Sequence, residues 1–163
     1  LPPQVPPLLR EHRLYQADWL MRFYGFTHEE IIVPGTAGML DLEVDPKLAW
    51  ALAHREHFPV NLNRAPKMWL LRVPGLGVRS VQRLLAARRV RLLRLADLQQ
   101  LRVATAKVLP FVETADYHPQ PATLESPQLR QQLLTRMPTT AAQHTHSGMQ
   151  LPTQAQLAQL ALF

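Results

Sequence analysis

A five-residue segment, VPGLG at residues 73–77, constrains the fold of this chain more than any other feature. Apolar residues recur at helical spacing on both sides of it, so it joins two predicted helices, at about residues 66–71 and 78–89. A turn between helices needs only one residue with a permissive backbone, and glycine supplies it. This turn has two, Gly75 and Gly77, and the second indicates that a ligand comes close to the backbone there.

Helices are also predicted before this turn. Across residues 8–23 an apolar and aromatic stripe recurs every three or four positions, which favours a helix that buries this stripe, formed by Leu8, His12, Tyr15, Trp19 and Phe23. Thr27 and Glu30 form the capping-box pattern of a short helix. Asp45 followed by Pro46 is the usual start of another helix.

The rest of the chain completes an all-α prediction. Residues 95–101 and 105–112 indicate a second, degenerate helix pair that lacks the Gly-x-Gly turn, and no strand pattern is strong enough to build a sheet. We therefore expect four regions: a proline-rich linker at 1–7, a helical connecting region packed on the hairpin at 8–60, the hairpin domain at 61–118, and a disordered tail rich in Gln, Pro, Thr and His at 119–163.

Positive charge is concentrated around the turn. Residues 64–107 contain 11 lysines and arginines but one acidic residue, Asp97, a net charge of +10, whereas the whole chain of 163 residues carries +6. Such a segment between nearly neutral flanks is typical of a protein that binds a polyanion. Fifteen of the 18 basic residues are arginine, whose planar guanidinium suits phosphate. A basic surface without a partner stays open as the alternative.

The start of the second predicted helix offers an anion site. Its first N–H groups have no partner inside the helix and lie at the positive end of the helix dipole. Arg79 disfavours the isolated helix in its first turn, so its position makes more sense beside a phosphate. Backbone donors carry no base-reading pattern, so phosphate binding is favoured over sequence readout. The predicted DNA-binding residues are Arg72, Pro74, Gly75, Leu76, Gly77, Val78, Arg79, Ser80, Arg83 and Arg88. The alternative to a phosphate site is a helix-turn-helix corner in which the glycines serve only to form the turn.

The turn resembles the helix-hairpin-helix motif of DNA repair and DNA uptake proteins. Residues 74–77 match the PGxG turn of that motif, and Arg79 matches its usual basic or polar residue, while Val81 stands where alanine is common. This resemblance implies that the hairpin backbone binds a DNA phosphate without reading sequence.

A wider resemblance extends from about Pro7 to Pro119. Three segments occur in order around the hairpin: LLREHRLYQADWLMRFYGFTHEEI, DPKLAWALAHREHFPVNLNRAP and LRLADLQQLRVATAKVLPFV. They resemble the C-terminal region of a radical S-adenosylmethionine protein family assigned to DNA modification or repair. In that family an N-terminal barrel holds an iron–sulfur cluster through a CxxxCxxC motif. The resemblance implies that the cluster and S-adenosylmethionine belong to a domain outside this sequence, and that this chain carries no catalytic site.

Other function classes receive little support from the sequence. The chain has no cysteine, which excludes disulfides, thiolate metal sites and a cysteine nucleophile. His54 and His57 share a helix face, but zinc would need two further ligands, so we expect no metal site. No run of 18 apolar residues and no leader is present, so a cytoplasmic protein is expected. Two alternatives stay open: a free-standing DNA-binding module of the DNA uptake type, and a protein–protein docking domain.

Overall fold

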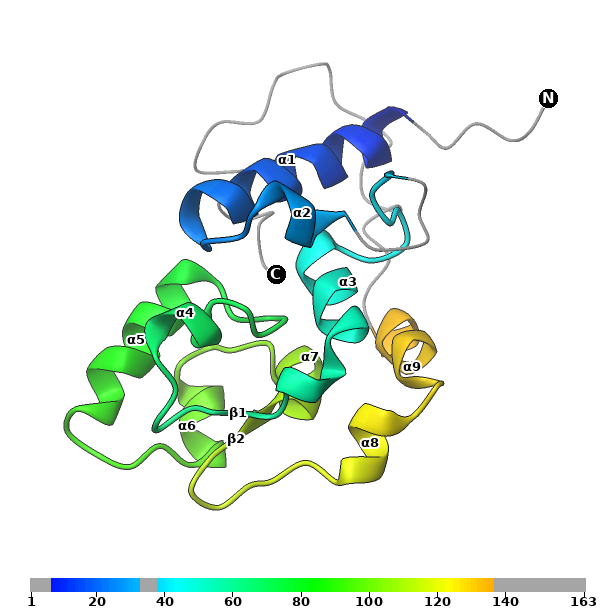
Figure 1. Ribbon diagram of the computed structural model, residues 1–163. Coiled ribbons are helices and arrows are strands. Elements are labelled where there is room, and N and C mark those ends of the chain that lie inside the picture. Colours follow the sequence, from blue (N-terminus) through cyan, green and yellow to red (C-terminus); the bar gives the residue numbers. More distant parts are fainter. Residues whose placement is uncertain (1–6, 33–37, 137–163) are drawn as a thin grey trace, which may run out of the picture.

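The computed structural model describes residues 7–32 and 38–136, which are mostly helical (Figure 1). The elements are α1 (Pro7–Phe23), α2 (His28–Ile31), α3 (Pro46–Ala53), η1 (Arg55–His57), β1 (Val60–Asn61), α4 (Lys67–Leu70), α5 (Val78–Arg88), α6 (Leu95–Gln100), α7 (Thr105–Val108), η2 (Leu109–Phe111), β2 (Val112–Glu113), α8 (Pro121–Glu125) and α9 (Leu129–Arg136). The predicted linker at 1–7 lies outside the described residues, except for Pro7 at the start of α1. No described helix is both long and apolar enough to cross a membrane.

Local sequence signals begin and end the first helices as predicted. Gly25, with φ of 72°, follows the end of α1. The Glu30 carboxylate accepts the N–H of Thr27 at 2.8 Å, and the Asp45 carboxylate accepts the N–H of Leu48 at 2.8 Å. These contacts satisfy backbone donors at the starts of α2 and α3 that the helices themselves leave unpaired.

A short parallel pairing of β1 with β2 was not predicted. Val60 lies opposite Val112, and Asn61 lies opposite Glu113. The pairing joins the chain just before α4 to the chain just after α7, so it closes the unit that holds both helix pairs (Figure 1). Strands of two residues are too short to show the alternation by which a sequence reveals a strand.

The predicted inner face of α1 is wrong. Leu8, Tyr15 and Phe23 are 75%, 46% and 50% exposed, whereas Ala17 and Leu20 on a different face are buried. Apolar side chains occur all around this helix, so the helical period alone does not single out the face that packs. Burial is decided by α3, which packs against α1.

The predicted disordered tail begins too early. Residues 121–125 and 129–136 form α8 and α9, and Leu124, Leu129 and Leu133 are buried there. The Arg55 guanidinium donates through Nη1 to the carbonyl of Leu124 at 3.0 Å, which fixes α8 to η1. Three leucines widely spaced among polar residues are a weak sequence signal, and their burial depends on contacts with distant parts of the chain. The remainder of the predicted tail, from residue 137, lies outside the described residues.

Candidate nucleic-acid interface

The turn between α4 and α5, residues 71–77, is packed into the core along its first part. Val73 and Leu76 are fully buried, as the sequence predicted, and Pro74 is buried with them. Accessible surface begins at Gly77, the residue before α5. Hereafter α4, this turn and α5 are called the hairpin. The candidate interface is therefore the start of α5 and not the turn as a whole.

The two glycines of the turn have different roles. Gly75 has φ of 88°, in the left-handed region that favours glycine, and a Cβ atom there would lie 2.6 Å from Val108 Cγ2 on α7. The fold therefore requires Gly75. Gly77 has φ of −80°, and its added Cβ would meet only the Tyr24 hydroxyl, at 3.6 Å, an ordinary contact. Gly75 alone therefore supplies the permissive backbone of the turn, and Gly77 needs no special backbone angle.

Lys47 on α3 holds the turn from beneath. Its side chain is fully buried, and Nζ donates to the carbonyl of Leu71 at 3.0 Å and to that of Leu76 at 2.6 Å. The ammonium also lies 4.7 Å from the centre of the Tyr24 ring. Burial lowers the pKa of Lys47 well below the usual lysine value, although nearby Asp45 acts in the opposite direction. Lys47 thereby ties the end of α4 to the end of the turn.

This contact also sets the direction of the next backbone donor. The peptide between Leu76 and Gly77 is trans, so its N–H points opposite to its C=O. Because the carbonyl of Leu76 points inward to Lys47, the N–H of Gly77 points away from the core. A buried lysine thus aims one backbone donor outward, next to the start of α5.

The first N–H of α5 already has a partner within the protein. Val78 donates its N–H to the Tyr24 hydroxyl at 3.2 Å, and burial raises the pKa of Tyr24 to about 12, so the phenol stays protonated. No side chain in the described part of the chain caps the N–H groups of Arg79 and Ser80. Together with Gly77, these residues leave three backbone donors at the positive end of the α5 dipole.

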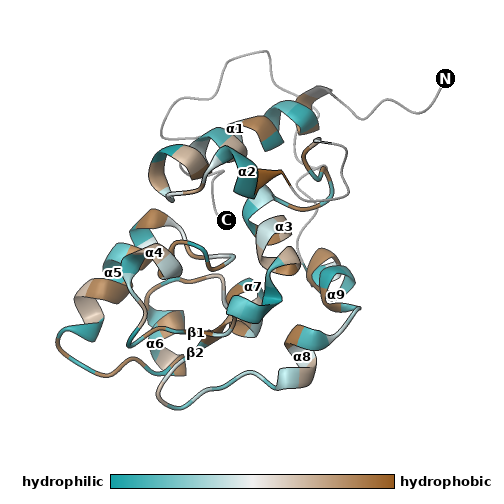
Figure 2. Ribbon diagram, in the orientation of Figure 1, coloured by the Kyte–Doolittle hydropathy of each residue, from teal (hydrophilic) through white to brown (hydrophobic). Residues whose placement is uncertain are grey.

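Exposed arginines lie next to these donors. Arg79 and Arg83 are exposed on one face of α5, where they line a hollow of about 440 Å³ together with Gln82 and Ala86. The opposite face holds Val81 and Leu84, both fully buried, and Figure 2 shows hydrophilic and hydrophobic parts of this helix. The other exposed cations between residues 64 and 107 are Arg64, Lys67, Arg89, Arg91, Arg94 and Arg102.

Two of the predicted phosphate ligands have structural roles instead. The Arg72 guanidinium is buried 4.3 Å from the centre of the Phe26 ring and 4.7 Å from that of Trp50. Its Nη1 lies 2.8 Å from Glu30 Oε1 in an ion pair. Partial burial would raise the pKa of Glu30, but the hydrogen bonds to its carboxylate, chiefly that from Arg72, together outweigh this effect and lower the pKa.

Arg88 is also directed inward, at the other end of α5. Its Nη1 donates to the carbonyl of Ala65 at 2.6 Å and to that of Leu62 at 3.3 Å, just before α4. The prediction that Arg72 and Arg88 reach phosphate is therefore corrected. A single sequence shows that an arginine is present but not that distant aromatic rings or carbonyls surround it.

The roles of Lys47 and Tyr24 beneath the turn were not predicted. One signal was available, because Lys47 lies within the apolar run PKLAWALA and a lysine in such a run is either a surface residue or a buried functional one. In the structure all residues from Pro46 to Ala51 are buried. Tyr24 gave no signal, since an aromatic residue at the end of a helix is ordinary.

His54 and His57 pack against Trp50. His54 shares a hydrogen bond of 2.9 Å between Nδ1 and the Trp50 carbonyl, and His57 stacks at the end of the same aromatic group. Over residues 7–32 and 38–136, no group of three or more His, Cys, Asp or Glu side chains is arranged to hold a metal ion. Comparisons of the chain with protein-family models, with curated proteins and with solved structures found no match in any of the three.

Proposed function

We propose that this chain binds DNA through backbone phosphates, without reading base sequence, and that its hairpin is a helix-hairpin-helix element. The observation that carries the proposal is the contrast between the two glycines. Gly75 is explained by packing against α7, whereas no contact within the described structure requires glycine at Gly77. The missing side chain at Gly77 leaves its outward N–H open to a phosphate oxygen.

The surrounding charge supports the same proposal. Arg79 and Arg83 flank the three backbone donors, and neither is paired with an acidic side chain in the described part of the chain. Phosphate would complete the site by accepting hydrogen bonds from the backbone and from the guanidinium groups. The groups that meet the phosphate would then be Gly77, Arg79, Ser80 and Arg83, with Val78 held by Tyr24.

The wider resemblance supplies a proposed setting. In that setting the chain presents DNA to a radical S-adenosylmethionine domain outside this sequence. This chain has no cysteine, so its own residues do not fit a three-cysteine cluster site, and no chemical step is assigned to them. A free-standing module of the DNA uptake type would use the hairpin in the same manner.

The proposal is tested by titrating a fluorescently labelled duplex with protein at several salt concentrations. If about four phosphates are contacted, the logarithm of the binding constant should fall against the logarithm of salt concentration with a slope of about −3 to −4. Arg79→Ala should make this slope shallower by about 1. The control is Arg10→Ala on α1, which removes the same charge about 20 Å along the helix from Tyr24.

Three results would contradict binding through phosphates alone at the hairpin. One is a flat salt dependence, and another is a strong preference for one base sequence. The third is equal weakening by Arg10→Ala and Arg79→Ala, which would point to diffuse attraction by net charge. Absence of any DNA binding would favour the docking alternative, for which α1 carries the exposed apolar side chains of Leu8, Leu14 and Phe23.

A further inference from the structure

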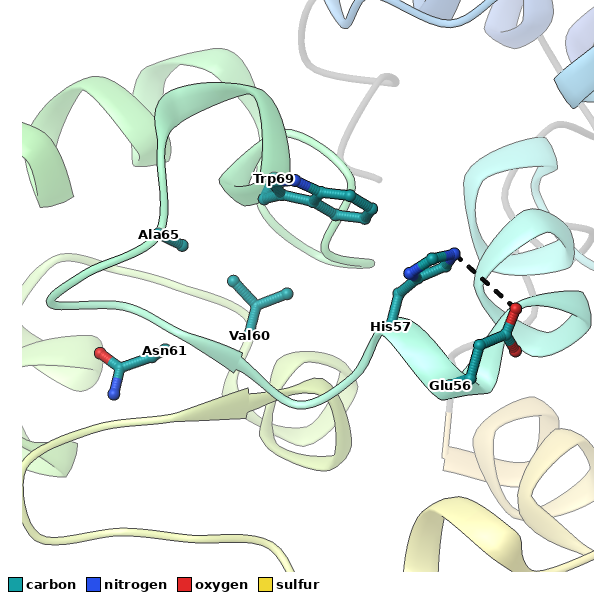
Figure 3. A pocket seen from close by; sticks show the side chains of 6 residues that line it. All are labelled: Glu56, His57, Val60, Asn61, Ala65 and Trp69. Carbon is teal, nitrogen blue, oxygen red and sulfur yellow. Dashed lines mark ion pairs between the residues drawn. The ribbon is translucent and has the colours of Figure 1, made fainter.

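A second surface hollow lies beside α4. It is a pocket of about 390 Å³ formed by Glu56, His57, Val60, Asn61, Ala65 and Trp69 (Figure 3). This volume lies within the usual range for small-ligand sites, about 300–1,000 Å³. The phosphate contacts proposed for α5 use none of these six residues, so the pocket is a separate feature of the molecule.

The aromatic part of the pocket is held rigidly from behind. The Trp69 ring lies 6.4 Å from Trp50 between ring centres, and the Arg72 guanidinium lies 5.9 Å from Trp69. His57 adds a third ring, 5.0 Å from Trp69 and nearly parallel to Trp50, at 6°. Figure 3 shows Trp69 from α4 and His57 from η1 at the same opening. A platform fixed in this manner loses little side-chain entropy when a flat ligand stacks on it.

The polar groups of the pocket differ in their freedom to meet a ligand. Asn61 is already used, because its amide donates to Glu113 Oε1 at 2.9 Å and its carbonyl accepts the N–H of Asn63 at 2.9 Å. His57 and Glu56 are exposed, and their Nε2 and Oε1 atoms are 3.7 Å apart, an ion-pair contact only when His57 is protonated. The Glu56 side chain can turn toward the edge of a ligand, whereas His57 stays stacked on Trp50.

Two exposed cations lie close to the pocket residues along the chain. Arg64 precedes Ala65 of the pocket, and Lys67 begins α4, two residues before Trp69; both are exposed. No acidic side chain pairs with either within the described residues. Aromatic rings beside unpaired cations are the combination that binds single-stranded nucleic acid, in which bases stack on the rings and phosphates meet the cations. A base inside a duplex has no free face for stacking, so the fitting ligand is an unpaired base.

We infer that this pocket receives an unpaired nucleobase of the bound DNA, which stacks on Trp69 and is flanked by His57. The inference rests on the proposed function, because α4 carries Trp69 and leads directly into the turn that precedes the phosphate donors. Stacking tolerates any base, since every base has a flat face, so the preference is for DNA structure and not for sequence.

The test compares two DNA duplexes that differ by one base. One is fully paired, and the other carries a single-nucleotide bulge of 2-aminopurine, whose fluorescence falls when it stacks. The wild-type chain should bind the bulged duplex about tenfold more tightly, the scale of one base stacked on an aromatic side chain, and should quench its fluorescence. His57→Ala and Trp69→Leu should each reduce the preference and the quenching while paired-duplex binding persists. His57 is exposed, so its variant keeps the core intact even if Trp69→Leu lowers stability.

Arg79→Ala separates this inference from the proposed function. It should weaken binding of both duplexes by the same factor and leave the preference for the bulge unchanged. Equal affinity of the wild-type chain for both duplexes, or a preference and quenching that survive in His57→Ala, would overturn the pocket inference while phosphate binding stands. If no duplex binds, the proposed function fails, and quenching of a single-stranded 2-aminopurine trinucleotide then decides the pocket alone: quenching that His57→Ala removes supports it, and no quenching overturns it.

Discussion

Replacing Gly75 by alanine should destabilise the fold strongly, whereas replacing Gly77 should hardly change its stability. In Gly75→Ala, an L-residue is forced to φ of 88°, which costs about 1–2 kcal/mol. The new methyl group also meets Val108 Cγ2 at 2.6 Å, and overpacking of this kind costs typically about 1–3 kcal/mol. Alanine restricts the unfolded chain and returns about 0.4–1 kcal/mol. The free energy of unfolding should therefore fall by about 2–4 kcal/mol.

Gly77→Ala is the matched control. Its φ of −80° suits alanine, and its methyl group meets only an ordinary contact, so the free energy of unfolding should change by less than about 0.5 kcal/mol. Thermal unfolding followed by circular dichroism should show Tm lowered by about 10 °C for Gly75→Ala, because 1 kcal/mol shifts Tm by about 3–6 °C in a domain of this size. Equal Tm values for the two variants would refute the distinction drawn between the glycines.

A second background isolates the steric part of the Gly75 penalty. Val108→Ala removes the methyl group that the new Cβ would meet, so the cost of Gly75→Ala should shrink in that background by about 1–2 kcal/mol, leaving the backbone strain. Chemical unfolding of the two single variants, the double variant and the parent gives this coupling directly. If Gly75→Ala costs the same in both backgrounds, close packing against α7 is not the reason for this glycine.

Four further outcomes are expected, three at buried charges and one at exposed Arg79. Arg72→Ala should lower the free energy of unfolding by about 2–4 kcal/mol, because it removes the ion-pair partner of Glu30 and the cation that lies among the aromatic rings. Arg79→Ala should leave thermal unfolding unchanged and weaken DNA binding by about 1–2 kcal/mol, because Arg79 is exposed. Lys47→Met should lower the free energy of unfolding by about 2 kcal/mol or more, measured by chemical unfolding, since two buried carbonyls lose their donor. Burial would raise the pKa of Asp45, but its ion pair with buried Lys107, whose Nζ lies 2.6 Å from Asp45 Oδ2, outweighs that effect and lowers the pKa. The ionised carboxylate therefore stabilises the fold above about pH 4, which is the pKa of aspartate in the unfolded chain. This contribution is lost as the pH falls further. The free energy of unfolding, measured from pH 7 to 3, should therefore depend less on pH in Asp45→Asn than in the parent.

Local signals in the sequence predicted the helices as far as α7, but not α8 and α9. Asp45 and Pro46 begin α3 because a carboxylate can accept a free N–H there and proline already has a helical φ, and both facts belong to the residues themselves. The turn was also predicted from local sequence, because glycine between two helices supplies the backbone angles that a turn requires. The positions of Gly77 and exposed Arg79 at the start of α5 were predicted as well, because the turn fixes where the second helix begins.

Features that depend on distant contacts could not be predicted in this manner. Arg72 looks like Arg79 in the sequence, yet it is buried because Phe26 and Trp50 come from segments more than 20 residues away. The support that Lys47 gives the turn spans a similar separation along the chain. Such partners are set by the way helices pack and leave no trace in local spacing.

Binding of a DNA phosphate by the N–H of Gly77 can be measured by amide NMR of the 163-residue chain, titrated with a short duplex at low salt. The amide signals of Gly77, Arg79 and Ser80 should shift progressively, while that of Gly75, buried in the turn, should move least. The same titration at high salt should suppress these shifts. Shifts confined to residues outside the start of α5, with the Gly77 signal unmoved at saturating DNA, would contradict phosphate binding by Gly77.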